Sequence, residues 1–343
     1  MPTPRLPAEW EKQSGIIIAW PHKNSDWVDS LPLVEATYLA LTRAITDYEK
    51  LVVIVYDESL QKHVKSLLNQ EEISLDNIIF SISETNDTWL RDSGPICLDK
   101  QCDHILNFRF NGWGNKFDAS KDNAINQALF EYGILKTEHF SSPEFILEGG
   151  SIESDGKGTL LTTSACLLTD TRNTLYSKDN ISQILENTLG INKILWLDHG
   201  YLAGDDTDSH IDMLARFIDS ETIAYIECTD KSDEHFDANQ AMREQLETFT
   251  NNLNKPYKLV PLPFSKPVLD STGRRLPASY ANFLIINNAV LLPVYDDEND
   301  KKAIEIMKNC FPDRNIIPIP FRHMIEQNGS LHCLTMQIPE GYL

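Results

Sequence analysis

Residues 204–217, G-D-D-T-D-S-H-I-D-M-L-A-R-F, are the stretch around which this chain is organised. Its first six residues are turn formers that bend and solvate the backbone, so they predict a loop. The apolar residues after His210 predict the start of a buried strand. Side chains two positions apart on a strand leave the same face. His210 and Asp212 are therefore expected to point together from the rim of a sheet, although an isolated H-x-D pair is usually structural.

The composition indicates a globular protein with an acidic surface. The chain has 343 residues, 41% of them hydrophobic and 24% charged, fractions that are typical of globular domains. Its 30 Lys and Arg residues against 51 Asp and Glu residues give a net charge of -21. This balance argues against nucleic acid and anionic membrane surfaces as partners and suits a cationic substrate.

The lack of a predicted membrane span or signal peptide and the pattern of cysteines favour a cytoplasmic location. The sequence has no run of about 18 apolar residues, so we expect no membrane span. The first ten residues, M-P-T-P-R-L-P-A-E-W, lack the apolar core of a signal peptide. Six cysteines occur without a C-x-x-C pair, which predicts neither a zinc knuckle nor a disulfide framework.

Strand and helix patterns alternate along the chain without a compositional break, which predicts one α/β domain over residues 1–343. Besides the strand after His210, strands are expected at 15–20, 51–56, 77–82, near Cys97, and at 105–110, 145–147, 159–163, 193–196, 222–227, 258–260, 283–286, 290–294, 316–318 and 331–335. Helices are expected at 33–48, 58–68, 123–132, 180–189, 234–253 and 301–309. The long loop 264–280 is either a surface excursion or a substrate lid.

Polar residues recur where predicted strands meet loops, at Asp92, Glu148, His210 and Cys333. Residues spread so evenly along a chain can meet only if the strand ends converge. Strand ends converge in this way around the axis of a closed, propeller-like or barrel-like arrangement.

Cys333 and His210 are the candidate nucleophile and base. His332 is not the obvious base for Cys333, because adjacent residues on a strand face opposite ways. A Cys–His pair alone would also suit acyl transfer. The remaining groups argue against that chemistry, since they are the carboxylates of Asp92, Glu148 and Asp212.

These carboxylates would repel an oxyanion but would bind a planar cation such as a guanidinium group. A guanidinium stays protonated at neutral pH and its carbon is already electrophilic, so neither a metal nor a cofactor is required. With Asp92 and Asp212 holding the nitrogens, Cys333 can attack the carbon. His210 can protonate the departing ammonia and then activate water to hydrolyse the S-alkylthiouronium.

A series of motifs in one order supports this chemistry over nearly the whole chain. They are L-P-A-E-W-E at 6–11, A-W-P-H at 19–22, N-D-x-W-x-R-D-x-G-P at 86–95, F-N-G-W-G at 110–114, L-E-G-G-S at 147–151, R-N at 172–173, G-D-D-T-D-x-H-x-D at 204–212, S-Y-x-N-F at 279–283 and H-C-x-T at 332–335. With these motifs the chain resembles the agmatine deiminases of the guanidino-group-modifying pentein superfamily, which includes bacterial peptidyl-arginine deiminases.

The resemblance implies a pentein-type five-bladed α/β propeller of ββαβ units with pseudo-fivefold symmetry. It implies Cys333 as nucleophile, His210 as general acid and base, and Asp92 and Asp212 as guanidinium-binding acids. Glu148 matches an acid that supports the histidine or the substrate. The chain departs from the family pattern where glycines are usual, at Ser209, Gln327 and Asn328.

The resemblance favours agmatine as substrate, hydrolysed to N-carbamoylputrescine and ammonia. Trp89 and Trp113 are either core residues or contacts for the methylenes and cationic end of the substrate. The alternatives are a deiminase of peptidyl-arginine or free arginine, a metallohydrolase that uses His210 and Asp212, and a binding module without activity. The expected partner is a small cationic guanidino compound, and the sequence leaves a homodimer open.

Overall fold

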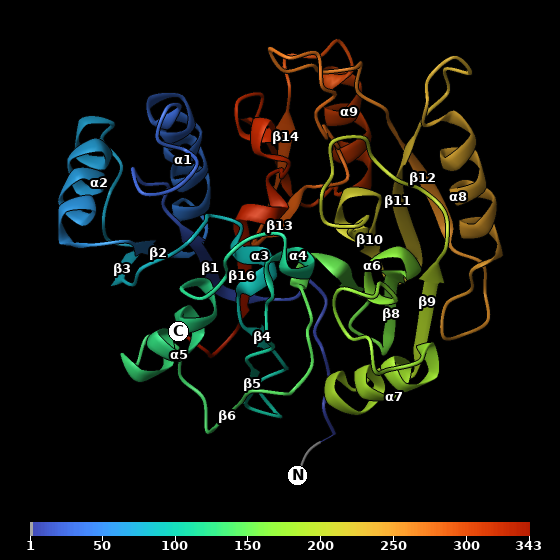
Figure 1. Ribbon diagram of the computed structural model, residues 1–343, viewed down its shortest axis with the longest axis horizontal. Coiled ribbons are helices and arrows are strands. Elements are labelled where there is room, and N and C mark those ends of the chain that lie inside the picture. The colour runs from blue at the N-terminus through green and yellow to red at the C-terminus, as the bar shows by residue number, and fades with distance from the viewer. Residues whose placement is uncertain (1–2) are drawn as a thin grey trace.

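Residues 3–343 are described by the computed structural model, and their strands form five separate small sheets (Figure 1). The predicted domain 1–343 also includes residues 1 and 2, which lie outside the described part. Four sheets share one order, an antiparallel pair followed by a third strand parallel to the second. Their strands are β4 (Ile96–Cys97), β5 (His104–Leu106) and β6 (His139–Ser141); β7 (Ile152–Ser154), β8 (Thr159–Thr163) and β9 (Lys193–Leu197); β10 (Ala215–Asp219), β11 (Thr222–Glu227) and β12 (Lys258–Pro263); and β13 (Leu284–Ile286), β14 (Ala289–Val294) and β15 (Asn315–Pro320).

The fifth sheet joins the two ends of the chain. It consists of β16 (Thr335–Pro339), β1 (Gln13–Ala19), β2 (Lys50–Val55) and β3 (Ile78–Ile82), in that order. The C-terminal β16 is antiparallel to β1, and β2 is parallel to β1. This sheet therefore repeats the order of the other four, with its first strand supplied from the far end of the sequence.

Helices connect the parallel strands and lie at the periphery of the molecule (Figure 1). They are α1 (Leu31–Thr46), α2 (Glu58–Gln70), α5 (Ile125–Glu131), α7 (Lys178–Leu189), α8 (Phe236–Thr248) and α9 (Asp300–Cys310). In α7 a capping box between Ser177 and Asn180 starts the helix, and Gly190 ends it with φ 70°, a left-handed conformation that costs glycine little. Its buried residues Ile181, Leu185 and Leu189 are four positions apart, so one face packs on the sheet.

Short helical turns come directly before the first strand of four sheets. They are α3 (Leu90–Ser93), η2 (Gly149–Ser151), η3 (Ile211–Met213) and η5 (His332–Leu334), which precede β4, β7, β10 and β16. The other short turns are α4 (Gly112–Asn115), η1 (Asp122–Ala124), α6 (Ser164–Leu167) and η4 (Met324–Gln327). In Figure 1 α3 and α4 lie near the middle of the molecule, between the strands of different sheets.

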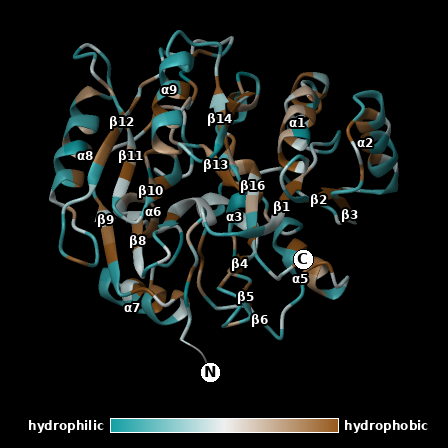
Figure 2. Ribbon diagram, turned by 180° about the vertical axis from the view of Figure 1, so that it is seen from behind, coloured by the Kyte–Doolittle hydropathy of each residue, from teal (hydrophilic) through white to brown (hydrophobic). Residues whose placement is uncertain are grey.

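The apolar core lies between the strands and the inner faces of the helices. Figure 2 shows hydrophobic residues concentrated in strands such as β9 and β12, and hydrophilic residues over much of α7 and α8. The predicted strand 51–56 corresponds to β2, whose residues Leu51 to Val55 are all fully buried. No helix within residues 3–343 has the length and apolar character needed to cross a membrane.

Some predicted elements differ from the structure. The predicted strand 105–110 ends at Leu106, and residues 145–147 form only an isolated bridge between Arg109 and Ile146. The predicted strand 331–335 is the turn η5, and β16 begins where that prediction ends. The apolar residues there predict a strand, but a short buried turn needs the same composition.

Candidate active site

The turns before the sheets carry the predicted site residues. Asp92 lies in α3 and Glu148 is the N-cap of η2. His210 is the N-cap of η3, Asp212 lies within η3, and Cys333 lies within η5. The expectation that His210 and Asp212 share one face of a strand is therefore wrong, since the chain turns after His210 instead of extending. The expectation that these residues gather near one place agrees with the geometry that follows.

Gly150 marks the point where three of these side chains converge. A Cβ atom added to Gly150 would lie 2.6 Å from His210 Nδ1, 2.8 Å from Asp92 Oδ1 and 3.1 Å from Asp212 Oδ2. The Gly150 amide also donates a hydrogen bond of 2.9 Å to Asp92 Oδ1. Any larger residue at this position would occupy the space between the imidazole and the two carboxylates.

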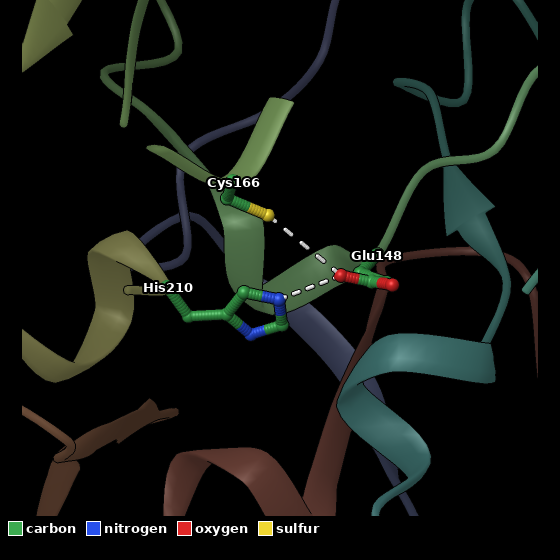
Figure 3. Close-up of side chains that lie close together, drawn as sticks. All are labelled: Glu148, Cys166 and His210. Atoms are coloured by element: carbon green, nitrogen blue, oxygen red, sulfur yellow. Dashed lines mark hydrogen bonds and ion pairs between the residues drawn. The ribbon is translucent and has the colours of Figure 1, made fainter. Parts of the chain in front are cut away.

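Glu148 holds the imidazole of His210 (Figure 3), and Arg172 in turn holds Glu148. His210 Nε2 lies 2.8 Å from Glu148 Oε2, and His210 Nδ1 lies 3.5 Å from Asp92 Oδ1. Arg172 Nε donates to both oxygens of Glu148, at 2.9 and 3.0 Å. Because Glu148 fixes Nε2, the other ring nitrogen is directed towards Asp92.

The Cys333 sulfur lies beside Asp212. Cys333 Sγ is 3.9 Å from Asp212 Oδ2 and 3.5 Å from Asn282 Oδ1. Asn282 also accepts from the amide of His332 at 2.8 Å and donates to the Asp212 carbonyl at 3.3 Å. This asparagine therefore ties the turn that carries Cys333 to the turn that carries Asp212.

Cys333 and Asp92 line a cavity of about 210 Å³. Both predicted tryptophans, Trp89 and Trp113, are among its lining residues. Trp113 Nε1 donates a 2.9 Å hydrogen bond to Asp92 Oδ2, and Trp89 packs against the backbone at Gly329. His210, Asp212 and Glu148 are buried and are not among the residues that line this cavity.

The protein groups around Cys333 disfavour a thiolate. Burial raises the pKa of Cys333 well above its usual value, and the carboxylates of Asp212 and Asp92 raise it further. Burial and the neighbouring Glu148 and Asp212 carboxylates raise the pKa of Asp92 to about 6, although His210 opposes them. A cation placed among these groups would offset their negative charge and favour both ionised forms.

The histidine and its acid form an ionised pair. Burial lowers the pKa of His210, but the negative charge of Asp92 and the contacts with Cys166 and Glu148 outweigh burial and place the pKa well above its ordinary value. Burial opposes ionisation of Glu148, yet the bonds from His210 and Arg172 outweigh it and lower the pKa of this carboxyl group. His210 is therefore suited to act as a proton donor.

Two side-chain atoms in the site lack partners. Within residues 3–343, neither His210 Nδ1 nor Asp212 Oδ1 has a hydrogen-bond partner, and both are buried. Buried polar atoms in proteins are nearly always satisfied. A bound molecule with N–H groups could satisfy Asp212 Oδ1.

Glu148, Cys166 and His210 form the cluster with the best spacing for a metal. Their ligand atoms lie within 4.8 Å of one another (Figure 3). The guanidinium of Arg172, however, already contacts both oxygens of Glu148, and its Nη2 lies 2.9 Å from Oε2. A metal ion there would be placed against this positive charge, so the residues present do not fit a resident metal. Asp212, which the metallohydrolase alternative requires, is instead bonded to His332.

Sequence reasoning missed three residues of the site: Asn282, Cys166 and Glu9. Asn282 stands in the motif S-Y-x-N-F and Glu9 in L-P-A-E-W-E, and the positions of those motifs were the available signal. Cys166 had no motif. Its thiol lies 3.8 Å from Glu148 Oε2.

Comparisons with known proteins agree with this geometry. The model of the Porphyromonas-type peptidyl-arginine deiminase family matches residues 5–339. A Selenomonas ruminantium protein named "Putative agmatine deiminase" is 33% identical, and the match covers 97% of this chain and 95% of the relative.

Solved structures match with the same coverage. A C. jejuni agmatine deiminase with substrate bound has a TM-score of 0.90 and 37% identity, over 99% of this chain and 97% of that one. The structure named "Putative Arginine Deiminase from Porphyromonas gingivalis" has a TM-score of 0.92 and 41% identity, over 98% and 99% of the two chains. The mixed α/β fold and the predicted resemblance are thereby confirmed, and the chain belongs to the Porphyromonas-type peptidyl-arginine deiminase family.

Proposed function

We propose that this protein hydrolyses the guanidinium group of agmatine to N-carbamoylputrescine and ammonia. The observation that carries the proposal is that a cysteine sulfur, two carboxylates and an imidazole lie close together beside one cavity. Cys333 and Asp92 line the cavity, and Asp212 Oδ2 lies 3.9 Å from the sulfur. The relatives from S. ruminantium and C. jejuni that are named for agmatine support the choice of substrate.

The guanidinium is held by Asp92 and Asp212. Its planar N–H groups match carboxylate oxygens, and Asp212 Oδ1 is a buried acceptor without a partner among the described residues. The positive charge of the substrate offsets the two carboxylates that raise the pKa of Cys333. Binding of the substrate therefore favours the thiolate that is to attack it.

The Cys333 thiol loses its proton to solvent when the cation binds, because His210 is already protonated. Attack of the resulting thiolate on the guanidinium carbon forms a C–S bond and a neutral tetrahedral adduct. His210, whose pKa is raised by Asp92 and Glu148, gives its proton to the leaving nitrogen near Asp92, and ammonia departs as the C–N bond breaks. The neutral imidazole then takes a proton from water, whose oxygen adds to the S-alkylthiouronium carbon. Cleavage of the C–S bond releases the ureido product and restores the thiol.

The cavity favours a substrate with a cationic far end. Among the described residues 3–343, neither a lysine nor an arginine lines it. Besides Asp92, its lining includes four acidic residues, which are Asp26, Asp87, Asp206 and Glu326. Agmatine ends in an ammonium group, whereas arginine places a carboxylate near this wall. The acids would attract the first and repel the second.

A product assay tests the proposal. We expect release of ammonia and a ureido product from agmatine, with kcat/KM at least about a hundredfold above that for free arginine or a peptide with C-terminal arginine. A preference for either arginine substrate would overturn agmatine in favour of the peptidyl-arginine or free-arginine alternative. Binding without product would overturn the enzymatic function.

We infer that the five sheets are the blades of a five-bladed α/β propeller within one catalytic domain of residues 1–343. The shared order of the sheets and the peripheral helices support this arrangement. The turns at the site, each placed before the first strand of a different sheet, support a common axis. A cytoplasmic location is also proposed, supported by the six free cysteines.

A further inference from the structure

A buried histidine joins the N-terminal segment to the guanidinium-binding acid. His332 Nδ1 lies 2.8 Å from Asp212 Oδ2, and His332 Nε2 lies 2.6 Å from Glu9 Oε2. All three side chains are buried. Glu9 belongs to the motif L-P-A-E-W-E and is separated from His332 by 323 positions, so the contact is a product of the fold alone.

The two contacts determine the protonation of His332. A neutral imidazole has one N–H donor, and its other nitrogen offers a lone pair. With carboxylate oxygens facing both nitrogens, a neutral ring would place that lone pair against one of them. Both bonds form only when His332 is an imidazolium.

Other charged groups hold Glu9 in place and surround His332. Glu9 also accepts from the Ile285 amide at 2.7 Å and lies 3.0 Å from Arg216 Nη2. Glu153 accepts from Arg216 Nε at 2.7 Å and from the Phe217 amide at 3.1 Å. The charged groups around His332 are three carboxylates and two guanidinium groups: Glu9, Glu153, Asp212, Arg91 and Arg216.

We propose that His332, protonated and held by Glu9, is a positioning residue that fixes Asp212 for guanidinium binding. Its bond occupies Asp212 Oδ2, and Asp212 Oδ1 is the oxygen without a partner in residues 3–343. His332 therefore decides which oxygen of Asp212 is left for the substrate. The inference rests on the guanidinium-binding role proposed above, and it gives the N-terminal motif a function at the site.

Two substitutions of His332 separate its two bonds. In His332→Asn the amide nitrogen stands near the place of Nδ1 and can still donate to Asp212, whereas in His332→Gln it stands near Nε2 and faces Glu9. We expect the Kd of agmatine, measured by calorimetry in a Cys333→Ser background, to rise about 10- to 100-fold for His332→Gln, as for loss of a hydrogen bond to a charged group. For His332→Asn we expect a smaller rise, below about tenfold. The exposed His63→Gln is the control and should bind as the parent does.

If the Kd of agmatine rises equally in the two variants while their Tm is unchanged, the positioning role is wrong. The role is also wrong if His332→Gln binds agmatine with the affinity of the parent. Because either variant could fail to fold, nitrogen NMR of histidine in a His210→Asn background provides a second measurement. We expect one histidine whose two ring nitrogens both carry hydrogen-bonded protons, as the contacts with Asp212 and Glu9 require. A spectrum without such a histidine would overturn the inference.

The NMR measurement does not depend on activity. A failure of the proposed function can therefore be distinguished from a failure of the inference about His332. If the unsubstituted protein releases no ammonia from agmatine while the NMR shows the imidazolium, the choice of substrate is wrong. If ammonia is released but the ring is neutral, the inference about His332 is wrong.

Discussion

The Cys333 sulfur lies among groups that oppose its ionisation, which makes the substrate part of the mechanism. Replacement of Cys333 by Ser preserves the size of the side chain but removes the nucleophile. We expect Cys333→Ser to bind agmatine while kcat falls by at least about a thousandfold. Calorimetry and an ammonia assay check the two halves of this expectation.

Cys102→Ser is a matched control, because Cys102 is only partly buried and is not among the residues that line the active-site cavity. It should keep the activity of the parent. Normal turnover in Cys333→Ser would show that another group is the nucleophile.

Asp92 serves binding at a cost to stability. Its pKa is raised from 3.8 to about 6 in the folded protein, so the folded state holds more protons than the unfolded state between these values. The free energy of unfolding therefore falls as pH rises from about 4 to 6, by at most about 3 kcal/mol from this group, and the loss persists above pH 6.

Asp92→Asn removes this cost. We expect it to raise the free energy of unfolding at pH 8 by about 1–2 kcal/mol, less than the full cost, because the asparagine keeps only part of the hydrogen bonds of Asp92. The gain should vanish near pH 4. Activity should fall by at least about a hundredfold. Denaturant unfolding at both pH values and the ammonia assay check this. A loss of stability at pH 8 or a mild effect on turnover would contradict the assignment.

At the scale of elements, the interior strands were predictable but the catalytic turns were not. Runs such as 51–56 have apolar residues at every position because both faces of β2 are covered. The turns η3 and η5 are three residues long and buried, too short to show helical periodicity. Their apolar residues therefore imitate strand ends. The residues that react could be identified from their motifs, but their backbone could not.

Gly150 in η2 tests how closely these turns pack. A methyl group at this position would lie 2.6 Å from His210 Nδ1, so the imidazole or Asp92 must move. We expect Gly150→Ala to reduce kcat/KM by at least about a hundredfold and the free energy of unfolding by about 1–3 kcal/mol.

Gly133→Ala is the control that separates the clash at the site from the general cost of replacing a glycine. Gly133 has φ 68°, and nothing lies within 4 Å of a Cβ added to it. This control should lose about 1 kcal/mol of stability through backbone strain alone and keep its activity. Full activity in Gly150→Ala would mean that the converging groups are not used together.

The loop 264–280 is tied to the cavity wall by Arg274. Its guanidinium donates to the side chain of Asn328 and, at 3.0 Å, to the Glu326 carbonyl. Asn328 in turn donates to Asp206 at 3.0 Å. Arg274→Ala should raise the KM of agmatine about threefold to tenfold with kcat little changed, since the bonds are exposed and weak. Arg243→Ala, an exposed arginine on α8, is the control, and an unchanged KM in Arg274→Ala would make the loop a surface excursion.

At the scale of the molecule, four of the five sheets each contribute one turn to the site. The even spacing of Asp92, Glu148, His210 and Cys333 along the sequence predicted that they meet, because only converging units bring such residues together. The contacts of Glu9 and Asn282 could not be predicted in this way. They join segments 323 and 50 positions apart, and their geometry depends on how neighbouring units pack.

The net charge of -21 gives the whole molecule a role in catalysis. Agmatine carries two positive charges, so the field of the protein should draw it towards the acidic cavity, and salt should screen that attraction. We expect kcat/KM for agmatine to fall about threefold to tenfold between 0.01 M and 0.5 M ionic strength, with kcat nearly constant. Free arginine has a net charge of one, so its kcat/KM should depend on salt less steeply. Initial rates for both substrates across this range check the prediction, and equal slopes would show that the attraction is local to the guanidinium and does not extend over the molecule.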